Sequence, residues 1–206
     1  TFREHSADVL LLSVSWPPNA LLLLKYTFEY RQHWRIMSLT FQTFPKSRAT
    51  PPVVRSAVSV LEKNFGIIDS HSQVDLQSND VLAVLREDLV EIGFEIETGK
   101  SADQKIKVAV LYGLNGQTTK TFDADGFHRG EGVVLEVEAG RAVSNYQFLK
   151  DLFQACAMQE AKHLLIAVRN DYRGSKDFDK VLNFMETLYA SARLVLPLES
   201  VTIVGY

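Results

Sequence analysis

Cysteine is almost missing from this sequence of 206 residues, which contains Cys156 alone. One cysteine cannot form an internal disulfide framework, and such a composition is typical of a reducing compartment. The five histidines are scattered, and no CxxC, HxH or HExxH spacing occurs. A disulfide-stapled fold is therefore excluded, a structural zinc site is disfavoured, and we expect a cytoplasmic protein.

An excess of charge of one sign and a membrane-length apolar run are also lacking. The net charge of −3 gives no overall sign of a nucleic-acid partner, although a local basic face is compatible with it. The most apolar stretch, residues 8–26, is interrupted by Pro17 and Pro18, so each run is far shorter than the about 20 residues that cross a bilayer. It also lacks the basic flank and the cleavage site of a signal peptide. We expect no membrane partner.

Residues 1–36 differ in character from the rest of the chain, and Met37 opens a stretch that resembles a natural start. Three interpretations of residues 1–36 are open: a β-hairpin or strand pair packed on the core, an extension from an upstream start, or a membrane segment. Residues 37–206 are expected to form a single domain, because the chain is long enough and, with 46% hydrophobic residues, apolar enough for a full core.

Apolar residues at helical spacing predict four helices, over 54–65, 80–92, 144–156 and 178–189. Gly66 is expected to end the first helix, and Ser144 to cap the third with Gln147 completing a capping box. Alternating or continuous apolar residues predict strands over 105–113, 119–127, 133–138, 163–168 and 200–206. Asn115-Gly116 is a strong signal for a hairpin turn between the first two strands.

The order of these elements is helix, three strands, helix and strand, with a further helix and strand after them. The first three strands are expected to form one antiparallel meander. The strand–helix–strand unit from Val133 to Val168 should be a right-handed parallel crossover. Residues 133–138 would then have neighbours on both sides, and the apolar strand 163–168 implies that helices cover the sheet. The predicted fold class is α/β, with a mixed sheet flanked by helices.

Two carboxylate doublets occur in the segment FDADGFHRGEGVVLEVEAGRA, residues 122–142. Each doublet skips one apolar residue, pairing Asp123 with Asp125 and Glu136 with Glu138. Because residues i and i+2 of a strand share a face, all four acids are predicted on one side of the sheet. The other side would carry the apolar residues of the same strands, which are Phe122, Ala124, Leu135 and Val137.

Carboxylates that converge repel one another, and burial increases that cost. Three arrangements can offset the repulsion: the acids could lie on a solvated face, share protons, or bind a cation. On a solvated face their partners would be Lys105, Lys107 or Lys120. Clustered oxygens suit a hard cation such as Mg²⁺, which binds through one or two carboxylates. The interior position predicted for residues 133–138 favours the cation.

The order of elements, with Asp on the second strand and E-x-E on the third, resembles the core of the PD-(D/E)XK superfamily, the restriction-endonuclease-like nucleases. The resemblance covers roughly residues 80–168 and is carried by VLEVEAGRA and the following helix. Asp125 matches the first acid of the family signature and Glu136 the second. Glu138 stands where the lysine usually is, and some type II restriction enzymes are similar in having E-x-E there.

This resemblance implies a restriction-endonuclease-like core, αβββαβ, and an endonuclease that uses Mg²⁺ or Mn²⁺ to hydrolyse DNA. A homodimer would be suited to cutting both strands of a duplex. Asp125 and Glu136 would bind the metal, and Glu138 would bind metal or act as the general base.

The same resemblance suggests further acids as candidate site residues. Asp123 is an alternative metal ligand, because a tight hairpin centred near residues 129–130 would place it opposite Glu136. In many members of the superfamily a glutamate on the first core helix also faces the metals. Glu87 and Glu91 are the candidates here, and Glu91 is preferred for a catalytic role because it lies nearer the sheet.

Four basic residues are candidates for contacts with a nucleic-acid backbone. Arg141 directly follows the E-x-E strand and could hold a phosphate through its guanidinium group. The segment RNDYRGSK after the strand 163–168 contributes Arg169, Arg173 and Lys176. A surface arginine paired with an acid, and a plain loop, are the competing interpretations of these two features.

Two other classes of function are open. A nucleic-acid-binding or assembly module could keep the same fold with acids that no longer catalyse. A glycosidase could use a carboxylate pair, but such sites usually lie in larger clefts lined by aromatic side chains.

Overall fold

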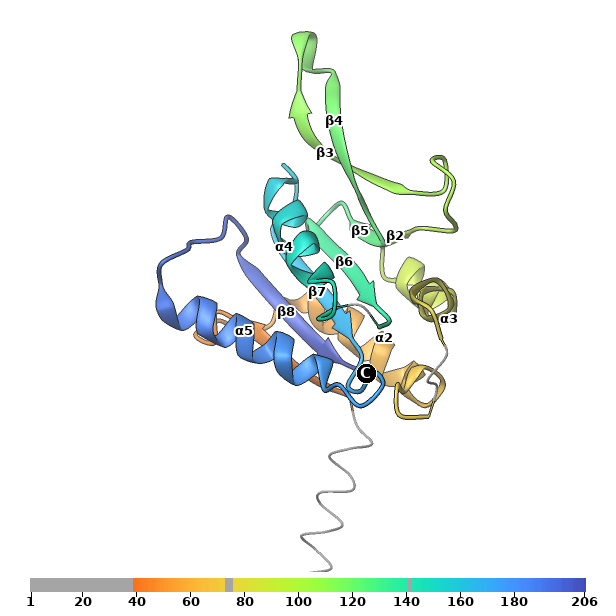
Figure 1. Cartoon of the computed structure of the whole chain (residues 1–206). Helices are drawn as coiled ribbons and strands as arrows, with labels where there is room; N and C mark the ends of the chain where they lie inside the picture. Colours follow the sequence, from red (N-terminus) through yellow and green to blue (C-terminus); the bar gives the residue numbers. More distant parts are fainter. Residues whose placement is uncertain (1–38, 73–75, 141) are drawn as a thin grey trace, which may run out of the picture. The chain divides into compact units, whose positions relative to one another are not determined.

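The computed structural model describes residues 39–72, 76–140 and 142–206 (Figure 1). The chain divides into two units after Met37, and the second unit, Ser38–Tyr206, holds every described residue. The three interpretations of residues 1–36, and the start at Met37, concern residues outside the described part.

Four α-helices and eight strands make up the described part of the chain. The helices are α2 (Pro52–Ile68), α3 (Ser78–Glu91), α4 (Gln147–Ala157) and α5 (Asp177–Ser191). The strands are β1 (Thr40–Phe44), β2 (Glu95–Ile96), β3 (Ile106–Tyr112), β4 (Thr118–Ala124), β5 (Gly126–His128), β6 (Val133–Glu138), β7 (His163–Val168) and β8 (Ser200–Gly205). Among the described helices, none combines the length and the apolar character needed to span a bilayer.

Six strands form one mixed sheet in the order β1-β8-β7-β6-β5-β2. Strands β6, β7 and β8 run parallel, whereas β1 and β5 run antiparallel to β8 and β6. The parallel pairing of β6 with β7, joined through α4, confirms the predicted parallel strand–helix–strand unit. Strand β6 lies between β5 and β7, so its interior position is also confirmed. The protein is a mixed α/β fold whose sheet is flanked by helices.

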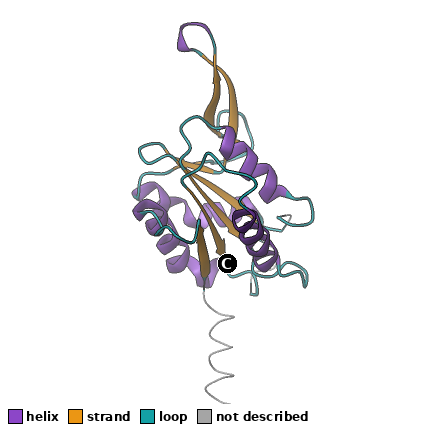
Figure 2. Ribbon diagram, turned by 90° about the vertical axis from the view of Figure 1, so that its left-hand side faces the viewer, coloured by secondary structure: helices purple, strands orange, loops and turns teal. Residues whose placement is uncertain are grey.

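Helices cover both faces of the large sheet (Figure 2). On one face, α2 and α3 pack against Val133, Leu135 and Val137 of β6. On the other face, α4 and α5 pack against Val134 and alternate residues of β7 and β8. Every residue of β7 and β8 is buried, as the continuous apolar run of β7 predicts. The two faces of β6 differ, because only the α4–α5 face also receives carboxylates.

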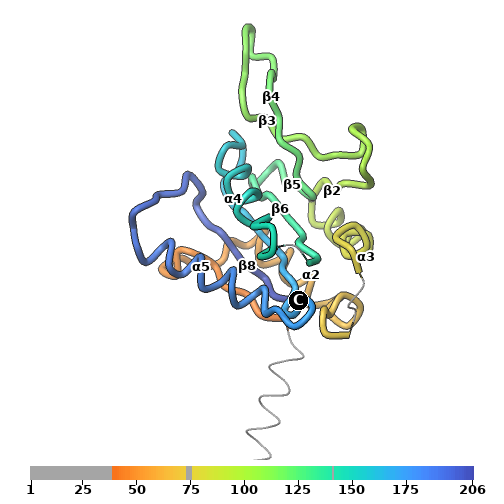
Figure 3. The backbone as a smooth tube through the Cα atoms, in the orientation of Figure 1, coloured from red at the N-terminus to blue at the C-terminus, as the bar shows by residue number. Residues whose placement is uncertain are grey.

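Strands β3 and β4 form a separate two-stranded sheet around the turn Leu114–Gly116. Asn115 and Gly116 both have positive φ, as expected of the predicted Asn-Gly turn. The predicted single meander is wrong in one respect, because the strand expected over 119–127 is divided into β4 and β5. Figure 3 follows β4 into β5, and only β5 pairs with β6.

Smaller differences arise where tertiary packing outweighs a local signal. Helix α2 continues past Gly66 to Ile68, whose side chain is fully buried in the core. Helix α4 begins at Gln147 after Tyr146, so Ser144 is not its cap. Strands β1 and β2 were not predicted, and both lie at the edges of the large sheet.

Candidate acidic site

Glu136 and Glu138 lie on the interior strand β6, on the face that α4 covers. Their neighbours Val133, Leu135 and Val137 belong to the opposite core, so the alternation of the strand directs both glutamates toward α4. Glu136 is 7% exposed, and Glu138 is partly buried. The interpretation of a solvated sheet face is therefore wrong for Glu136.

Asp125 lies where β4 ends and β5 begins. The register pairs Gly126 with Leu135, so one further step places Asp125 opposite Glu136. The Val137 N–H donates a hydrogen bond to Asp125 Oδ2 at 2.8 Å. The carboxylate thus satisfies an amide of β6 beyond the end of β5, which holds the Asp125 side chain against β6. Asp125 and Glu136 are thereby brought together from neighbouring strands.

Asp123 lies in different surroundings from Asp125, because it is exposed on β4 in the two-stranded sheet. Phe122 and Ala124 of the same strand pack with the core of α4 and α5 rather than with the α2–α3 face of β6. The predicted common face of the two doublets is therefore wrong. Side chains i and i+2 share a face only while both residues belong to one strand of one sheet. At Asp125 the chain passes from the two-stranded sheet to the six-stranded sheet, so this rule does not connect Asp123 with Asp125.

Glu97 adds a carboxylate that the sequence reasoning missed. It follows β2, and its N–H donates to the Asp125 carbonyl at 2.9 Å. Glu97 is 4% exposed, and Lys105 Nζ lies 2.6 Å from Glu97 Oε2. The Arg86 guanidinium donates to the Glu97 carbonyl at 3.0 Å. Glu97, Asp125 and Glu136 therefore follow one another across β2, β5 and β6, and Lys105 neutralises the outermost acid.

Asp151 supplies a further carboxylate from α4, which packs against β6. It is 3% exposed and lies on the buried face of the helix. Its carboxyl group is within hydrogen-bonding reach of Glu138. Lys150 Nζ is 3.6 Å from Asp151 Oδ1, and 60% of the Lys150 side chain is exposed. Asp151 Oδ2 has no hydrogen-bond partner among the described residues.

Burial and mutual repulsion raise the pKa values of Asp125, Glu136 and Glu138. Burial raises the pKa of Asp125 to about 7, and repulsion from Glu97 and Asp151 adds to the effect. Burial also raises the pKa of Glu138 to about 9, with a further contribution from its hydrogen bond with Asp151. The pKa of Glu136 is well above its ordinary value, through burial first and the charge of Asp125 second. Without a cation, a pKa of about 9 means that Glu138 retains its proton at neutral pH, and a pKa of about 7 means that Asp125 is protonated in part.

A buried group of acids is stabilised by sharing protons or by binding a cation. Carboxylate oxygens suit Mg²⁺, which keeps several waters and needs only one or two carboxylates. Among the described residues, no group of three or more His, Cys, Asp or Glu is placed to hold a metal ion. A cation at this site would therefore be held by two carboxylates and waters, for which Asp125 with Glu136, and Glu138 with Asp151, are the chemically suitable pairs.

Glu91 is not brought to the acidic site. It is exposed at the last residue of α3, and that helix packs on the face of the sheet opposite the one toward which Glu136 points. The hydrogen bond and charge of Asp88 raise the pKa of Lys63 on α2, and the charge of Glu91 adds a smaller contribution. Glu87 is also exposed on α3. The expectation that the first core helix contributes a catalytic glutamate is wrong for these two residues.

Arg169 is also misplaced for its predicted role, because it is 2% exposed. Its Nη2 donates to the Leu76 carbonyl at 2.9 Å, and its guanidinium group lies against the Tyr206 hydroxyl. That hydroxyl donates to the Glu138 carbonyl at 3.3 Å. Arg169 therefore supports the end of β6 from inside, and the prediction that it contacts DNA is wrong.

Arg173 and Lys176 are exposed in the loop between β7 and α5. The Arg173 guanidinium lies over the Tyr172 ring, 5.3 Å from its centroid. Tyr172 packs against Gly140, where an added Cβ would collide with the ring. Through Tyr172, the loop thus places the exposed Arg173 near the chain that leaves β6. Arg141 lies outside the described residues.

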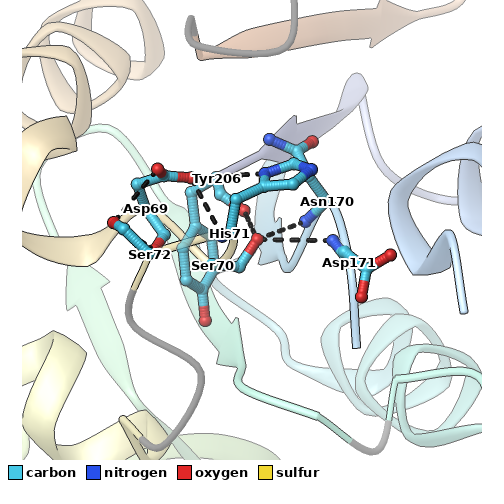
Figure 4. A network of polar contacts seen from close by, with 7 residues as sticks. All are labelled: Asp69, Ser70, His71, Ser72, Asn170, Asp171 and Tyr206. Atoms are coloured by element: carbon cyan, nitrogen blue, oxygen red, sulfur yellow. Dashed lines mark hydrogen bonds and ion pairs between the residues drawn. The ribbon is translucent and has the colours of Figure 1, made fainter. Parts of the chain in front are cut away.

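Ser70 anchors the start of the same loop (Figure 4). Its hydroxyl donates to the Tyr206 carbonyl at 2.5 Å and accepts from the N–H groups of Asn170 and Asp171 at 3.0 and 3.3 Å. The Asn170 N–H also donates to the Tyr206 carbonyl at 2.7 Å. Ser70 therefore joins the segment after α2 to the chain that follows β7 and β8.

The two missed acids left only weak signals in the sequence. Glu95 and Glu97 repeat the E-x-E spacing, but β2 has too few residues to show a pattern. Asp151 is the acid on the buried face of α4, whose other buried residues are Phe148, Leu152 and Ala155. Phe153 of the same helix is apolar and yet 57% exposed, so apolar character alone does not indicate that Asp151 lies on the buried face.

Comparison of the chain with family models, with curated proteins and with solved structures gives no significant match.

Proposed function

We propose that this protein is a Mg²⁺-dependent endonuclease that hydrolyses phosphodiester bonds of DNA. The observation that carries the proposal is the pair of Asp125 and Glu136, brought together from neighbouring strands. Each of the two carboxyl groups raises the energy of charging the other in a buried position. Lys105, whose charge favours ionised Asp125, is already paired with Glu97. Buried neighbouring carboxyl groups with raised pKa values are typical of functional sites. The resemblance to restriction-endonuclease-like nucleases supplies the reaction class.

The roles of the residues follow from their positions. Asp125 and Glu136 would hold the cation through one oxygen or more each. Bound Mg²⁺ would polarise a phosphoryl oxygen and make the attacking water more acidic. Glu138, next on the same face and less buried, would accept the proton of that water or complete the ligand set. Arg173 would hold a neighbouring phosphate through its exposed guanidinium group.

A homodimer of such domains would bring two acidic sites to a duplex, one for each strand. Supercoiled plasmid separates single-strand from double-strand cutting. A dimer acting in one encounter would produce linear plasmid early in the reaction, whereas independent sites would produce nicked circles first.

Incubation of the full chain with plasmid DNA and with RNA of matched length tests the proposal. We expect Mg²⁺ or Mn²⁺ to support DNA cleavage, and a chelator to stop it. Preferential cutting of the RNA would mean that the substrate is RNA instead of DNA, with the same metal-dependent hydrolysis. A folded chain that cuts neither substrate in either metal would overturn the proposal.

A second candidate is a nucleic-acid-binding or assembly module on the same fold. The observation in its favour is that no group of three or more potential ligands is placed to hold a metal among the described residues. Under this alternative the acids would share protons, and the exposed cations Arg173 and Lys176 would carry the interaction. Binding of DNA by gel shift, with no cutting in Mg²⁺ or Mn²⁺, would favour it.

A further inference from the structure

The outer part of the β3–β4 hairpin is exposed to solvent along its whole length. All ten residues from Leu111 to Lys120 are exposed, across the end of β3, the turn and the start of β4. Figures 1 and 2 show the hairpin extending beyond the six-stranded sheet. Residues 111–120 are called the arm below. They are accessible for contacts with another molecule.

The arm has a defined conformation although it is exposed. Its base is fixed by Gln159, which follows α4 and donates its backbone N–H to the Ala109 carbonyl at 2.9 Å and its side-chain amide to the Val110 carbonyl at 3.0 Å. Val110 also packs in the core beneath α4 and α5. At the tip, the Gly113 N–H donates to the Gln117 carbonyl at 2.8 Å. A partner would therefore meet a preformed surface, which lowers the entropic cost of binding.

The side chains of the arm combine apolar and hydrogen-bonding groups. Leu111 is 58% exposed, Tyr112 51% and Leu114 89%. A group of exposed apolar side chains of this kind marks an interaction site. The other large side chains of the arm can form hydrogen bonds, and they are Asn115, Gln117, Thr118, Thr119 and Lys120.

The charge of the hairpin is opposite in sign to that of the chain. Residues 104–121 contain three lysines and no aspartate or glutamate, whereas the whole chain has a net charge of −3. Lys105 is paired with Glu97, and Lys107 lies opposite Asp123, whereas Lys120 belongs to the arm itself. A hairpin with this charge is complementary to a polyanion rather than to a positively charged partner.

Strand β4 leads from the arm directly to the acidic site. Asp125 follows the last residue of β4 and comes five residues after Lys120. At about 3.3 Å per residue, the backbone between them spans at most about 17 Å, which corresponds to about five base pairs of a duplex. The major groove of such a duplex is wide enough for a two-stranded β-ribbon. DNA bound at Asp125 and Glu136 would therefore lie within reach of the arm.

We propose that the arm is a DNA-contacting ribbon that lies in the major groove, within about five base pairs of the bond at the acidic site. The inference rests on the proposed function, because it adds a binding surface for the substrate of that site. Asn115 and Gln117 would hydrogen-bond with base edges, and Leu114 would contact the methyl groups of thymine. Lys120 would contact a phosphate. A second copy of the chain is a less suitable occupant, because two arms in contact would bring their lysines together.

Photocrosslinking of the full chain to a duplex of mixed sequence tests the contact. The probe carries 5-iodouracil in place of thymine, so the photoreactive atom lies in the major groove where the methyl group would be. Chelator prevents cutting, and low salt favours binding. Trypsin cleaves after Lys107 and Lys120 and releases residues 108–120 as one peptide. We expect crosslinked DNA on that peptide.

A double variant, Tyr112→Thr with Leu114→Ser, removes the apolar contacts and leaves the Asn115-Gly116 turn intact. Its affinity for the labelled duplex should fall about tenfold, the value of one lost base contact. In cleavage assays its KM should rise with kcat unchanged, because the contact is made equally before and during the reaction.

The matched control is Leu194→Ser with Val195→Thr. These two residues are 47% and 88% exposed in the loop between α5 and β8, and their replacement should leave affinity and KM unchanged. The exposed positions of all four residues make unfolding of either double variant a small risk.

Crosslinks only outside residues 108–120, with wild-type affinity of the arm variant, would overturn the contact and leave the nuclease standing. A wild type that is a dimer in sedimentation, an arm variant that is a monomer, and no crosslink on that peptide would also overturn it and would identify the arm as an interface between copies. Crosslinks on the peptide without cutting in Mg²⁺ or Mn²⁺ would refute the nuclease and keep the DNA contact. A wild type that neither binds nor cuts DNA would refute both.

Discussion

The two-stranded sheet and the six-stranded sheet both carry carboxylates, and they place them in opposite surroundings. On β4, Asp123 is exposed to solvent and lies across the hairpin from Lys107. On β6, Glu136 is 7% exposed, with paired strands on both sides and a helix above. Asp125 follows Asp123 by two residues and yet belongs to the second environment. Whether an acid is an exposed surface charge or a candidate metal ligand therefore depends on whether it lies in the large sheet, more than on its spacing along the chain.

The same comparison indicates which acids are retained for stability and which are not. An exposed acid such as Asp123 costs little, because water solvates its charge. Buried acids such as Glu136 and Asp151 would be replaced by apolar residues in a fold selected for stability alone. Sequences break local rules of this kind mainly at functional sites. The predictions below compare variants from the two environments.

The largest contrast is expected between Glu136→Gln and Asp123→Asn. Glu136→Gln should reduce Mg²⁺-dependent cleavage by orders of magnitude, because a neutral amide is a poor ligand for a hard cation. Without metal it should be as stable as the wild type or more stable, since one repelling charge is removed. Asp123→Asn should change neither property by much. Rates of plasmid cleavage and thermal unfolding in chelator check both variants, and equal activity of the two would contradict the assignment.

Glu138→Lys and Glu138→Ala separate the roles open to Glu138. Both should abolish cleavage if Glu138 is a ligand, because neither side chain can replace an anionic donor. Glu138→Lys should also stabilise the metal-free protein, since its ammonium group would face Asp151. Cleavage assays and thermal unfolding measure these effects. Measurable cutting by the lysine variant, with none by the alanine variant, would instead mean that Glu138 only positions or deprotonates water.

Stability should depend on pH through the buried acids. The folded-state pKa values of Asp125 and Glu138, about 7 and about 9, lie above those of the unfolded chain. The folded state therefore binds more protons, and this contribution to the free energy of unfolding is complete below the unfolded pKa values, at about pH 4. It is lost as pH rises, by at most about 1.4 kcal/mol per pH unit for each group. Urea unfolding between pH 5 and 9, in chelator, measures the loss.

Glu138→Gln should flatten the upper part of that pH profile, because its amide does not titrate. Asp123→Asn should keep the wild-type slope. Stabilisation by Mg²⁺ should grow over the same range, since protons and the cation compete for the same oxygens. A metal-free protein whose stability rises from pH 5 to 9 would contradict the raised pKa values.

The smallest expected effect concerns the exposed cations. Arg173→Ala should weaken DNA binding and reduce the slope of log affinity against log salt by about 0.9, the value for one lost phosphate contact. Lys63→Ala, on α2 at the opposite face of the sheet, should leave the slope unchanged. Fluorescence anisotropy with a labelled duplex at several salt concentrations measures both. Equal slopes for the two variants would remove Arg173 from the interface.

The sequence was sufficient to predict the position of a residue where that position depends on a single strand or helix. The alternation of β6 placed Glu136 and Glu138 on one face, and the apolar run of β7 indicated an interior parallel strand. The sequence was not sufficient where residues from two elements come together. Glu97 reaches the buried acids Asp125 and Glu136 through a strand of two residues, and Asp151 reaches them because of the way α4 is rotated against β6. At Asp125, between β4 and β5, the side chain accepts a hydrogen bond from the Val137 N–H, and no local pattern reveals that contact.

Thermal unfolding during a Mg²⁺ titration at pH 8 tests most directly whether the buried acids of the large sheet form a cation site. The wild-type unfolding temperature should rise steadily with the logarithm of Mg²⁺ concentration above the dissociation constant, because the ion binds the folded state. The double variant Asp125→Asn with Glu136→Gln should start at an equal or higher temperature and rise much less. A flat wild-type curve, or an equal rise in the double variant, would contradict the account.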